Sequence, residues 1–391
     1  MKILHVSPAF YPAVHWGGPI FSTYGLCNAL AAIPSVRLKV LTTDSAGPAL
    51  SQRVRPESNP VAYPNGYEVR FTRRIWGTAV SPGQLMFLPS MIRWADVVHL
   101  TGTYSFPTLP TLLLARLFAK PLVWSPRGAL QRWNRVSKPG VKRFWEILCN
   151  ALIRRGSTVL HVTSDEEAEA SARRMPKAKV RMIPNGVDIP DHLPGREWRP
   201  EGNLRLMYLG RLDPIKGIEH LLRALPRFTG EKVSLQIYGT GDAAYVTTLE
   251  RLAAELNLSA VVTLRGHLEP AGKSAAFAAA DLCLVPSFTE NFGMTVAEAL
   301  AHGVPVVASR GTPWSGMVEH GCGWWVDNSP EELAKAIREA MTADLELMGD
   351  EGRAWMKAEF SWPSAATAMH RVYLDLVDAG ERMDGQSCGR L

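Results

Sequence analysis

The chain has 391 residues, of which 46% are hydrophobic and 20% charged, a balance that suits about two globular domains with ample core. Its five cysteines are scattered and form no CxxC pair, which argues against a zinc site or a disulfide framework and favours a reducing cytoplasm. No apolar run reaches the roughly 18 residues that span a bilayer, and the run at the N-terminus is too short for a signal peptide.

The formal net charge of +6 is distributed unevenly. Residues 1–190 contain 24 Lys and Arg against 10 Asp and Glu, whereas residues 191–391 contain 19 against 27. This asymmetry predicts an anionic partner for the first half. An anionic membrane surface fits the charge as well as a nucleic acid does. The basic residues form no RRM, KH or zinc-finger pattern, so we expect no nucleic acid.

Apolar runs typical of buried strands alternate with helical segments along the chain, which predicts parallel, doubly wound α/β sheets with right-handed crossovers. The expected strands of the first half are 2–7, 37–43, 96–102, 121–126 and 158–164, and those of the second half are 204–211, 233–241, 261–267, 281–287 and 304–309. The expected helices include 21–33, 217–228, 245–257, 271–280, 294–303 and 330–343. Two such series predict two Rossmann-like domains.

The segment 183–203 is rich in proline, glycine and charge and has no apolar run, so we expect it to link the domains. The expected domains are residues 1–188 and 189–362. A final helix, 363–380, has Pro363 near its first turn and is expected to pack back on the first domain. Ligands of doubly wound sheets bind beyond the carboxyl ends of the strands, so the site is expected in a cleft between the domains.

Three features of the first half lie at or near the ends of predicted strands. Gly17-Gly18 precedes a helix and would let a ligand approach the backbone, or would simply make the loop flexible. His99 lies near a strand end, where a structural hydrogen-bonding role competes with a functional one. Arg127-Gly128 follows another strand, again at the edge where ligands bind.

In the second half, Arg211 and Lys216 flank a proline-containing loop between a predicted strand and a helix. Two cations there suit a diphosphate, which arginine holds bidentately and lysine as a point charge, although solvated loop cations would look the same. Gly239-x-Gly241 also follows a strand. The third glycine of a dinucleotide-binding loop is replaced by Ala244, which favours an ordinary tight turn.

Glu290 and Glu298 enclose the sequence NFGMTVA, which joins a buried strand to a helix. The N–H groups at the start of such a helix bind anions, and carboxylates accept hydrogen bonds from sugar or ribose hydroxyls. A capped helix with a solvated Glu298 is the alternative. The sequence contains no GxxxxGK[ST], GxSxG, HExxH or DxD pattern, which argues against a P-loop NTPase and against a metal-bound nucleotide-sugar site.

In order, these segments resemble a family 4 retaining glycosyltransferase of group 1, over residues 1 to about 375. The resemblance rests on Gly17-Gly18, PNGVD (184–188), GR…KG (210–217), YGTGD (238–242) and the block from Glu290 to Glu298. It implies the GT-B fold: two Rossmann-like, doubly wound parallel-sheet α/β domains facing across a cleft. The first domain would hold the acceptor and the second the nucleotide-sugar donor.

The resemblance also implies roles for individual residues. Arg211 and Lys216 would neutralise the donor diphosphate, Glu290 would hold hydroxyls of the transferred sugar, and Glu298 would hold the ribose hydroxyls. The remaining donor-binding positions are mainly backbone contacts: Gly17, Gly18, Gly239, Gly241, Gly266, His267, Asn291, Phe292, Gly293, Met294 and Thr295.

One position departs from the family pattern, because Arg127 stands where members often carry a histidine near the donor sugar. Arg127 would contact a phosphate or a sugar hydroxyl, so it is grouped with the catalytic residues. It cannot act as a base because it stays charged. His99 is a candidate to compensate for the missing histidine.

These roles imply retaining transfer of a hexosyl unit from a UDP- or GDP-sugar to a hydroxyl of a lipid-linked, polysaccharide or lipopolysaccharide-type acceptor. The nucleotide-sugar is a co-substrate, and no cofactor or essential metal is expected. Two alternatives remain: a non-catalytic sugar-nucleotide-binding subunit, and a GT-B epimerase or phosphorylase.

The segment Lys138–Gly156 mixes lysines and arginines with residues such as Phe144 and Trp145. This composition suits a helix on a membrane surface, or a core helix with solvated ends. We therefore expect a cytoplasmic protein that binds peripherally to the inner face of the cytoplasmic membrane.

Overall fold

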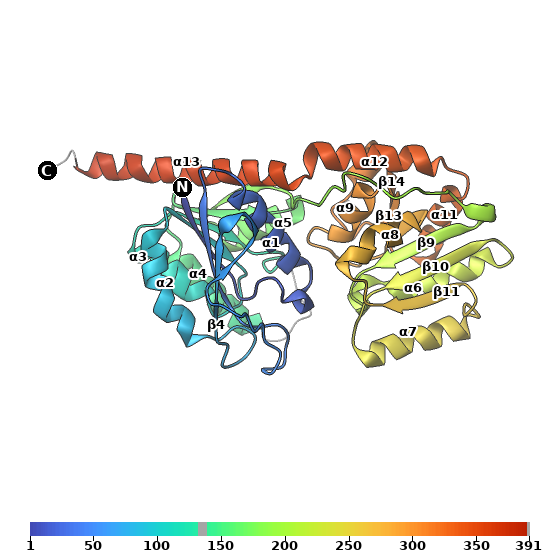
Figure 1. Ribbon diagram of the computed structural model, residues 1–391, viewed down its shortest axis with the longest axis horizontal. Coiled ribbons are helices and arrows are strands. Elements are labelled where there is room, and N and C mark those ends of the chain that lie inside the picture. Colours follow the sequence, from blue (N-terminus) through green and yellow to red (C-terminus); the bar gives the residue numbers. More distant parts are fainter. Residues whose placement is uncertain (132–138, 389–391) are drawn as a thin grey trace. The chain divides into compact units, whose positions relative to one another are not determined.

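The computed structural model describes residues 1–131 and 139–388 of the chain (Figure 1). The contacts divide the chain into two compact units. Unit 1 comprises Met1–Gly186 and Trp362–Leu391, and unit 2 comprises Val187–Ser361. The boundary lies inside the segment that the sequence analysis took as a linker.

Unit 1 is built on an eight-stranded sheet with the order β3-β4-β2-β1-β5-β6-β7-β8. Neighbouring strands are parallel except for β3 and β4. The strands are β1 (Lys2–Val6), β2 (Arg37–Thr43), β3 (Val61–Ala62), β4 (Glu68–Thr72), β5 (Val97–Thr101), β6 (Leu122–Ser125), β7 (Thr158–Val162) and β8 (Lys179–Met182). The apolar-run pattern missed β3, β4 and β8, whose residues are partly exposed.

Helices cover both faces of this sheet, which explains why its central strands read as continuous apolar runs. They are α1 (Gly18–Ala31), α2 (Pro82–Trp94), α3 (Thr108–Leu117), α4 (Pro139–Leu152), α5 (Asp165–Arg174) and α13 (Trp362–Cys388). Successive residues of a strand face opposite sides. Ile3 of β1 belongs to the buried cluster formed with α1 and α13, whereas Leu4 belongs to the cluster formed with α2, α3 and Cys149 of α4.

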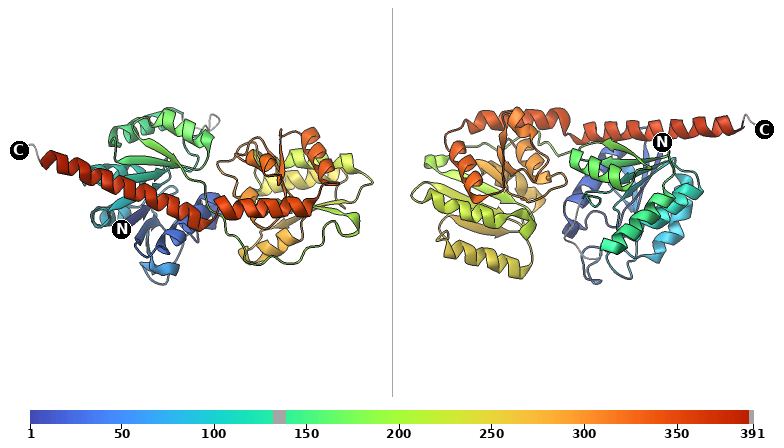
Figure 2. Two further views of the ribbon diagram at one scale, coloured as in Figure 1. Left: turned by 90° about the horizontal axis from the view of Figure 1, so that it is seen from above. Right: turned by 180° about the vertical axis from the view of Figure 1, so that it is seen from behind.

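Helix α13 returns the chain to unit 1, where it packs against α1; Figure 2 shows this helix in red. Trp362, its first residue, packs where two glycines leave room. A Cβ added at Gly25 of α1 would lie 2.2 Å from the Trp362 ring, and one at Gly186 would lie 2.5 Å from it. Gly186 of the PNGVD segment therefore has a packing role in unit 1. The helix continues past the expected end to Cys388.

Unit 2 is built on a six-stranded parallel sheet with the order β11-β10-β9-β12-β13-β14. The strands are β9 (Leu204–Leu209), β10 (Val233–Tyr238), β11 (Val262–Gly266), β12 (Leu282–Val285), β13 (Val306–Ser309) and β14 (Gly323–Val326). The helices are α6 (Ile218–Ala224), α7 (Ala243–Glu255), α8 (Lys273–Ala278), α9 (Met294–Ala301), α10 (Gly316–Glu319), α11 (Pro330–Ala340) and α12 (Leu345–Glu359). Leu206 packs in the cluster with α6 and α11, and Met207 packs in the cluster with α9 and α12.

The second part of the expected linker is integrated into unit 2. Arg196 donates hydrogen bonds to the carbonyls of Gly303 at 2.6 Å and Phe277 at 3.0 Å. Arg199 donates to the carbonyl of Ala340 at 3.1 Å. The prediction of a linker is therefore wrong for residues 187–203, because arginines in an apparently polar segment satisfy carbonyls of the domain that follows.

None of the described helices is long and apolar enough to cross a membrane.

Candidate active site

The strand order of unit 2 reverses between β9 and β12, because β10 and β11 extend the sheet on one side of β9 and β12 to β14 on the other. Doubly wound sheets bind ligands beyond the carboxyl ends of the strands at such a reversal. The loops that leave β9 and β12 carry Arg211, Lys216 and Glu290. The topology therefore brings the most strongly predicted site residues to one edge of unit 2.

The loop after β9 is rigidly shaped. Tyr208 is buried and donates a hydrogen bond to the Arg211 carbonyl at 2.9 Å. Burial, and then the charge of Glu290, raise the pKa of Tyr208 well above its usual value, so its hydroxyl stays a donor. Asp213 accepts a hydrogen bond from the Ile215 amide at 3.1 Å and lies 3.3 Å from the Arg211 guanidinium. The Arg211 side chain is well exposed, so it is open to a ligand.

Lys216 and Glu290 form an ion pair that joins the two loops. The Lys216 Nζ lies 2.5 Å from Glu290 Oε1, and the Ser287 hydroxyl donates to the same oxygen at 2.8 Å. Gly217, in the left-handed region with φ 67°, allows this approach, since a Cβ there would lie 2.1 Å from the Pro286 carbonyl oxygen. We predicted that Lys216 binds the donor diphosphate and that Glu290 binds sugar hydroxyls, whereas in the structure the two side chains bind each other.

The segment from Asn291 to Thr295 leads into α9. Gly293 has a φ of 79°, a conformation that favours glycine, and precedes the first residue of the helix. Phe292 is buried against Trp314, whose indole N–H donates to the Phe292 carbonyl. The Thr295 hydroxyl donates to the Leu209 carbonyl at 3.0 Å. The side chains of Phe292 and Thr295 thus anchor the loop, and ligand binding by the backbone of this segment stays a prediction.

Glu298 is paired with Lys273, a residue that the sequence analysis missed. The Lys273 Nζ, at the start of α8, lies 2.7 Å from Glu298 Oε1. A single lysine 25 positions away from its partner carries no motif, so only the folded chain reveals the pair. The alternative of a merely solvated Glu298 is excluded in the structure by this contact.

Gly239 and Gly241 have a packing reason that needs no ligand. A Cβ at Gly239 would lie 1.8 Å from the Gly210 carbonyl oxygen, and one at Gly241 would lie 2.1 Å from the Leu212 carbonyl oxygen. The loops after β9 and β10 remain paired beyond the strands, because the Leu212 amide donates to the Thr240 carbonyl at 2.9 Å. The tight turn therefore explains these glycines, as Ala244 suggested.

Gly266 and His267 end β11 at the same edge of the sheet. Gly266 has a φ of 72°, and a Cβ there would meet no atom of the described residues within 4 Å. His267 is exposed, with Nε2 3.5 Å from Glu269 Oε1. The role of this pair in binding the donor stays a prediction.

In unit 1, Gly17 and Gly18 lie in the loop between β1 and α1, and the strand order of this sheet reverses between β1 and β5. Gly17 needs glycine for its φ of 71°. A Cβ at either position would meet no described atom within 4 Å. The backbone at Gly18 is therefore open, unlike that at Gly239.

Arg127 does not lie in an open position. Its φ is 56°, and its guanidinium turns into unit 1, where Nη1 donates to Asn185 Oδ1 at 2.6 Å. The Nε and Nη2 atoms are buried without a partner among the described residues. Burial lowers the pKa of Arg127. The structure thus favours a role in holding the PNG segment over the predicted contact with a phosphate or sugar hydroxyl.

His99 is fully buried in the middle of β5. Its Nδ1 lies 2.5 Å from the Tyr373 hydroxyl and its Nε2 lies 2.7 Å from Ser125 Oγ. Burial, and then His5, His161 and Arg127, hold its pKa well below the usual range. With both ring nitrogens occupied inside the core, His99 is a structural residue and cannot compensate for the family histidine.

Helix α4 begins at Pro139, so Lys138 of the predicted membrane segment lies outside the described residues. Along α4, Val141, Phe144 and Ile147 are about 60% exposed at helical spacing. Arg143 is also exposed. The opposite side of α4 packs on the core, as the core-helix alternative expects, because Cys149 is buried and Trp145 and Leu152 pack against the same apolar cluster.

Among the described residues, no group of three His, Cys, Asp or Glu side chains is placed to bind a metal ion. The candidate site of unit 2 instead offers exposed and ion-paired cations, carboxylates and a helix start. This combination suits a ligand with both an anionic group and hydroxyls.

Two α/β units built on parallel sheets of this topology define the GT-B fold. Comparison with known proteins supports this fold assignment. The chain has a TM-score of 0.73 with sucrose-phosphate synthase from Thermosynechococcus elongatus, at 22% identity, covering 97% of this chain and 100% of that one. It has a TM-score of 0.73 with Anabaena Alr3699/HepE in complex with UDP, at 20% identity, covering 95% and 99%.

The family follows from the sequence matches. Residues 17–186 match the glycosyl transferase 4-like domain, and residues 194–355 match glycosyl transferases group 1. The chain belongs to this family, the group 1, family 4 glycosyltransferases. A D-inositol 3-phosphate glycosyltransferase of Corynebacterium jeikeium is 31% identical over 62% of this chain and 63% of that relative, so the match spans less than two thirds of the relative's length.

Proposed function

We propose that the chain is a retaining glycosyltransferase that moves a hexosyl unit from a UDP- or GDP-sugar to an acceptor hydroxyl. The observation that carries the proposal is the Lys216–Glu290 pair, 2.5 Å apart, at the strand-order reversal of unit 2. The family and the UDP bound to HepE, a relative in fold, support a nucleotide-sugar partner.

Each site residue has a chemical task in this proposal. Arg211 and Lys216 bind the donor diphosphate and stabilise the negative charge that grows on it as the bond to the sugar breaks. Glu290 accepts hydrogen bonds from hydroxyls of the transferred sugar, and Glu298 from those of the ribose. Donor binding therefore replaces part of the Lys216–Glu290 contact, because the lysine turns to phosphate and the carboxylate to hydroxyls.

The transfer breaks the bond between the anomeric carbon and the diphosphate oxygen and forms one to the acceptor oxygen. The acceptor oxygen attacks from the face of the sugar that the diphosphate leaves, and its proton passes to the leaving phosphate. Neither glutamate therefore has to act as a nucleophile. Preorganised cations are the main source of rate.

Nucleotide release from UDP-glucose, UDP-N-acetylglucosamine and GDP-mannose, with and without candidate glycan acceptors, tests the proposal. Lys216→Ala is expected to slow transfer about 100- to 1,000-fold, the range for losing one preorganised charge donor. Lys335→Ala, an exposed lysine of α11, is the matched control and keeps full rate. The proton coupling of the product's anomeric carbon distinguishes retention from inversion. Unchanged transfer by Lys216→Ala, or an inverted product, contradicts the proposal.

We also propose that the acceptor is presented at a membrane and that α4 binds an anionic bilayer. Val141, Phe144 and Ile147 are exposed beside Arg143, and the first half of the chain carries excess positive charge. An exposed apolar stripe flanked by arginines inserts into the headgroup region of anionic lipid.

Sedimentation with phosphatidylglycerol vesicles at low salt tests the membrane proposal. Phe144→Glu is expected to reduce binding, while Leu347→Glu, which changes an exposed apolar residue of unit 2, leaves it unchanged. Failure of the unmodified chain to sediment with these vesicles would overturn the membrane proposal and leave the glycosyl transfer untouched.

A further inference from the structure

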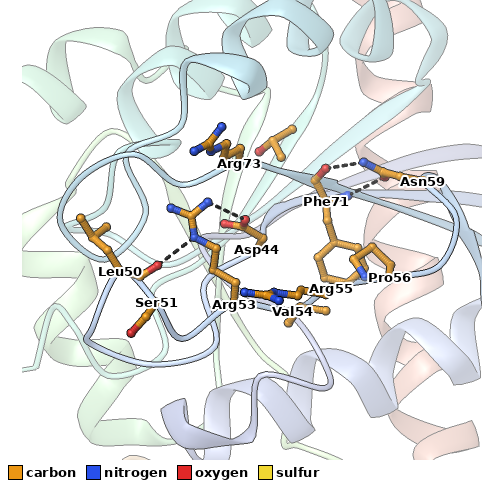
Figure 3. Close-up of a pocket in the computed structure, with 11 residues that line it drawn as sticks. Asp44, Leu50, Ser51, Arg53, Val54, Arg55, Pro56, Asn59, Phe71 and Arg73 are labelled. Atoms are coloured by element: carbon orange, nitrogen blue, oxygen red, sulfur yellow. Dashed lines mark hydrogen bonds and ion pairs between the residues drawn. The ribbon is translucent and has the colours of Figure 1, made fainter.

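Unit 1 contains an open surface pocket of about 500 Å³ that none of the site residues above lines. It lies between the segment 44–59 and the end of β4, as Figure 3 shows. Its polar lining includes Asp44, Arg53, Arg55, Asn59 and Arg73, and we call it the arginine pocket. Cavities of roughly 300–1,000 Å³ are typical of small-molecule sites.

A buried arginine fixes the wall of the arginine pocket. Arg74 is fully buried and donates to the carbonyls of Gly47 at 2.7 Å and Gln52 at 3.1 Å, and also to that of Ala49. The Val54 amide donates to the Asp44 carbonyl at 2.8 Å and closes the loop. The wall is therefore held in place by the fold itself, and a ligand finds a preformed cavity.

The charges of the arginine pocket do not balance. Arg53 donates to the Leu50 carbonyl at 2.8 Å and lies 3.6 Å from Asp44, whose charge it offsets (Figure 3). Arg55 and Arg73 are exposed and have neither a hydrogen bond nor an ion pair with any described residue. Two guanidinium groups without an ionic partner among the described residues remain, so the pocket carries excess positive charge that suits an anionic group such as a phosphate.

The position of the pocket connects it with the open glycine loop. The pocket adjoins the carboxyl ends of β2 and β4, the edge where doubly wound sheets bind ligands. The Trp16 indole N–H, next to Gly17, donates to the Ser45 carbonyl at 3.3 Å. Val54, which lines the pocket, packs in the same apolar cluster as Trp16. The pocket wall and the glycine loop are thus one packed structure.

We propose that the arginine pocket binds the phosphate group of a phosphorylated sugar acceptor through Arg55 and Arg73. The proposal rests on the proposed function, because it names the chemical class of the acceptor for that reaction. The phosphate can belong to a soluble sugar phosphate or to a lipid-linked phosphate, and both present the same dianionic oxygen atoms to the two guanidinium groups.

Calorimetric titration of the full chain with glucose 6-phosphate tests the soluble source, with glucose as the neutral comparison. Phosphatidylcholine vesicles with and without undecaprenyl phosphate test the lipid source. Arg55→Gln/Arg73→Gln should weaken binding of one of these phosphates about tenfold or more, the cost of losing one charge-assisted hydrogen bond. Arg37→Gln/Arg181→Gln removes two exposed arginines elsewhere in unit 1, at the amino end of β2 and in β8, and should leave binding unchanged.

A second comparison separates this inference from the proposed function. UDP and GDP binding should weaken in Lys216→Ala and persist in Arg55→Gln/Arg73→Gln, whereas phosphate-acceptor binding should show the reverse pattern. Failure of both nucleotides to bind any variant contradicts the proposed function. Nucleotide binding together with no phosphate binding, or with phosphate binding that ignores Arg55 and Arg73, overturns the arginine pocket. Phosphate binding lost only in Lys216→Ala also overturns it, because the phosphate would then occupy the donor site.

Discussion

Acidification should destabilise unit 1 because three histidines are buried in its core without charge. His5, His99 and His161 are at most 3% exposed, and their rings form a hydrogen-bonded group with Thr101, Ser125 and Tyr373. Burial first, and Arg127 next, lower the pKa of His5 and of His161 to about 3. The pKa of His99 is also well below 6.5.

The direction of the pH effect on stability follows from the difference in proton uptake between the unfolded and the folded chain. Below pH 6.5 the unfolded chain protonates these histidines and the folded chain does not, so the free energy of unfolding falls as pH falls from 6.5 towards 3. Between about pH 7 and pH 5, each such histidine removes about 2 kcal/mol, so the three together remove on the order of 6 kcal/mol. That is comparable with the whole stability of a typical domain, about 5–15 kcal/mol.

Urea unfolding at several pH values between 7 and 5, followed by circular dichroism, measures this loss. Hydrogen exchange of peptides from β1, β5 and β7 assigns the transition to unit 1. His99→Gln, which retains hydrogen-bonding capacity, should reduce the pH dependence by about a third. An unfolding free energy that does not change between pH 7 and pH 5 would refute the reasoning that these rings are neutral in the fold.

Two glycines of α1 should respond differently to alanine. Gly25→Ala places a Cβ 2.2 Å from the Trp362 ring and should lower the free energy of unfolding by about 1–3 kcal/mol, the usual cost of overpacking. The Cβ of Gly18→Ala meets open space, so the thermal unfolding midpoint should be unchanged. Equal unfolding midpoints for Gly25→Ala and Gly18→Ala would contradict this difference. Glu298→Gln should weaken nucleotide binding about tenfold or more, because the amide has one uncharged acceptor oxygen where the carboxylate offers two charged ones to the ribose hydroxyls, while the far-ultraviolet spectrum stays the same. Unchanged affinity of Glu298→Gln for both UDP and GDP would remove the ribose role.

The sequence predicted the parallel α/β architecture because buried parallel strands are long apolar runs flanked by loops. It missed β4 and β8, whose exposed charged residues interrupt that pattern. It also took residues 187–203 for a linker, since composition does not show that Arg196 binds carbonyls from distant turns.

The candidate site, too, could be predicted only in part from the sequence. Lys216 and Glu290 were predicted separately, from loops at strand ends, but their pairing depends on Gly217 fitting against Pro286, a contact between the loops after the neighbouring strands β9 and β12. Lys273 carries no motif and was found only through Glu298. The sequence placed Arg127 at the correct edge of the sheet and His99 in the correct strand. It did not indicate the direction of either side chain, which is determined by packing inside unit 1.

Calorimetric titration of UDP and GDP into the unmodified chain, Lys216→Ala and Lys335→Ala tests whether the loops after β9 and β12 form the donor site. We expect one of the two nucleotides to bind, Lys216→Ala to weaken its binding about tenfold or more, and Lys335→Ala to leave it unchanged. Binding of neither nucleotide, or equal affinity in all three proteins, would contradict a donor site at the Lys216–Glu290 pair.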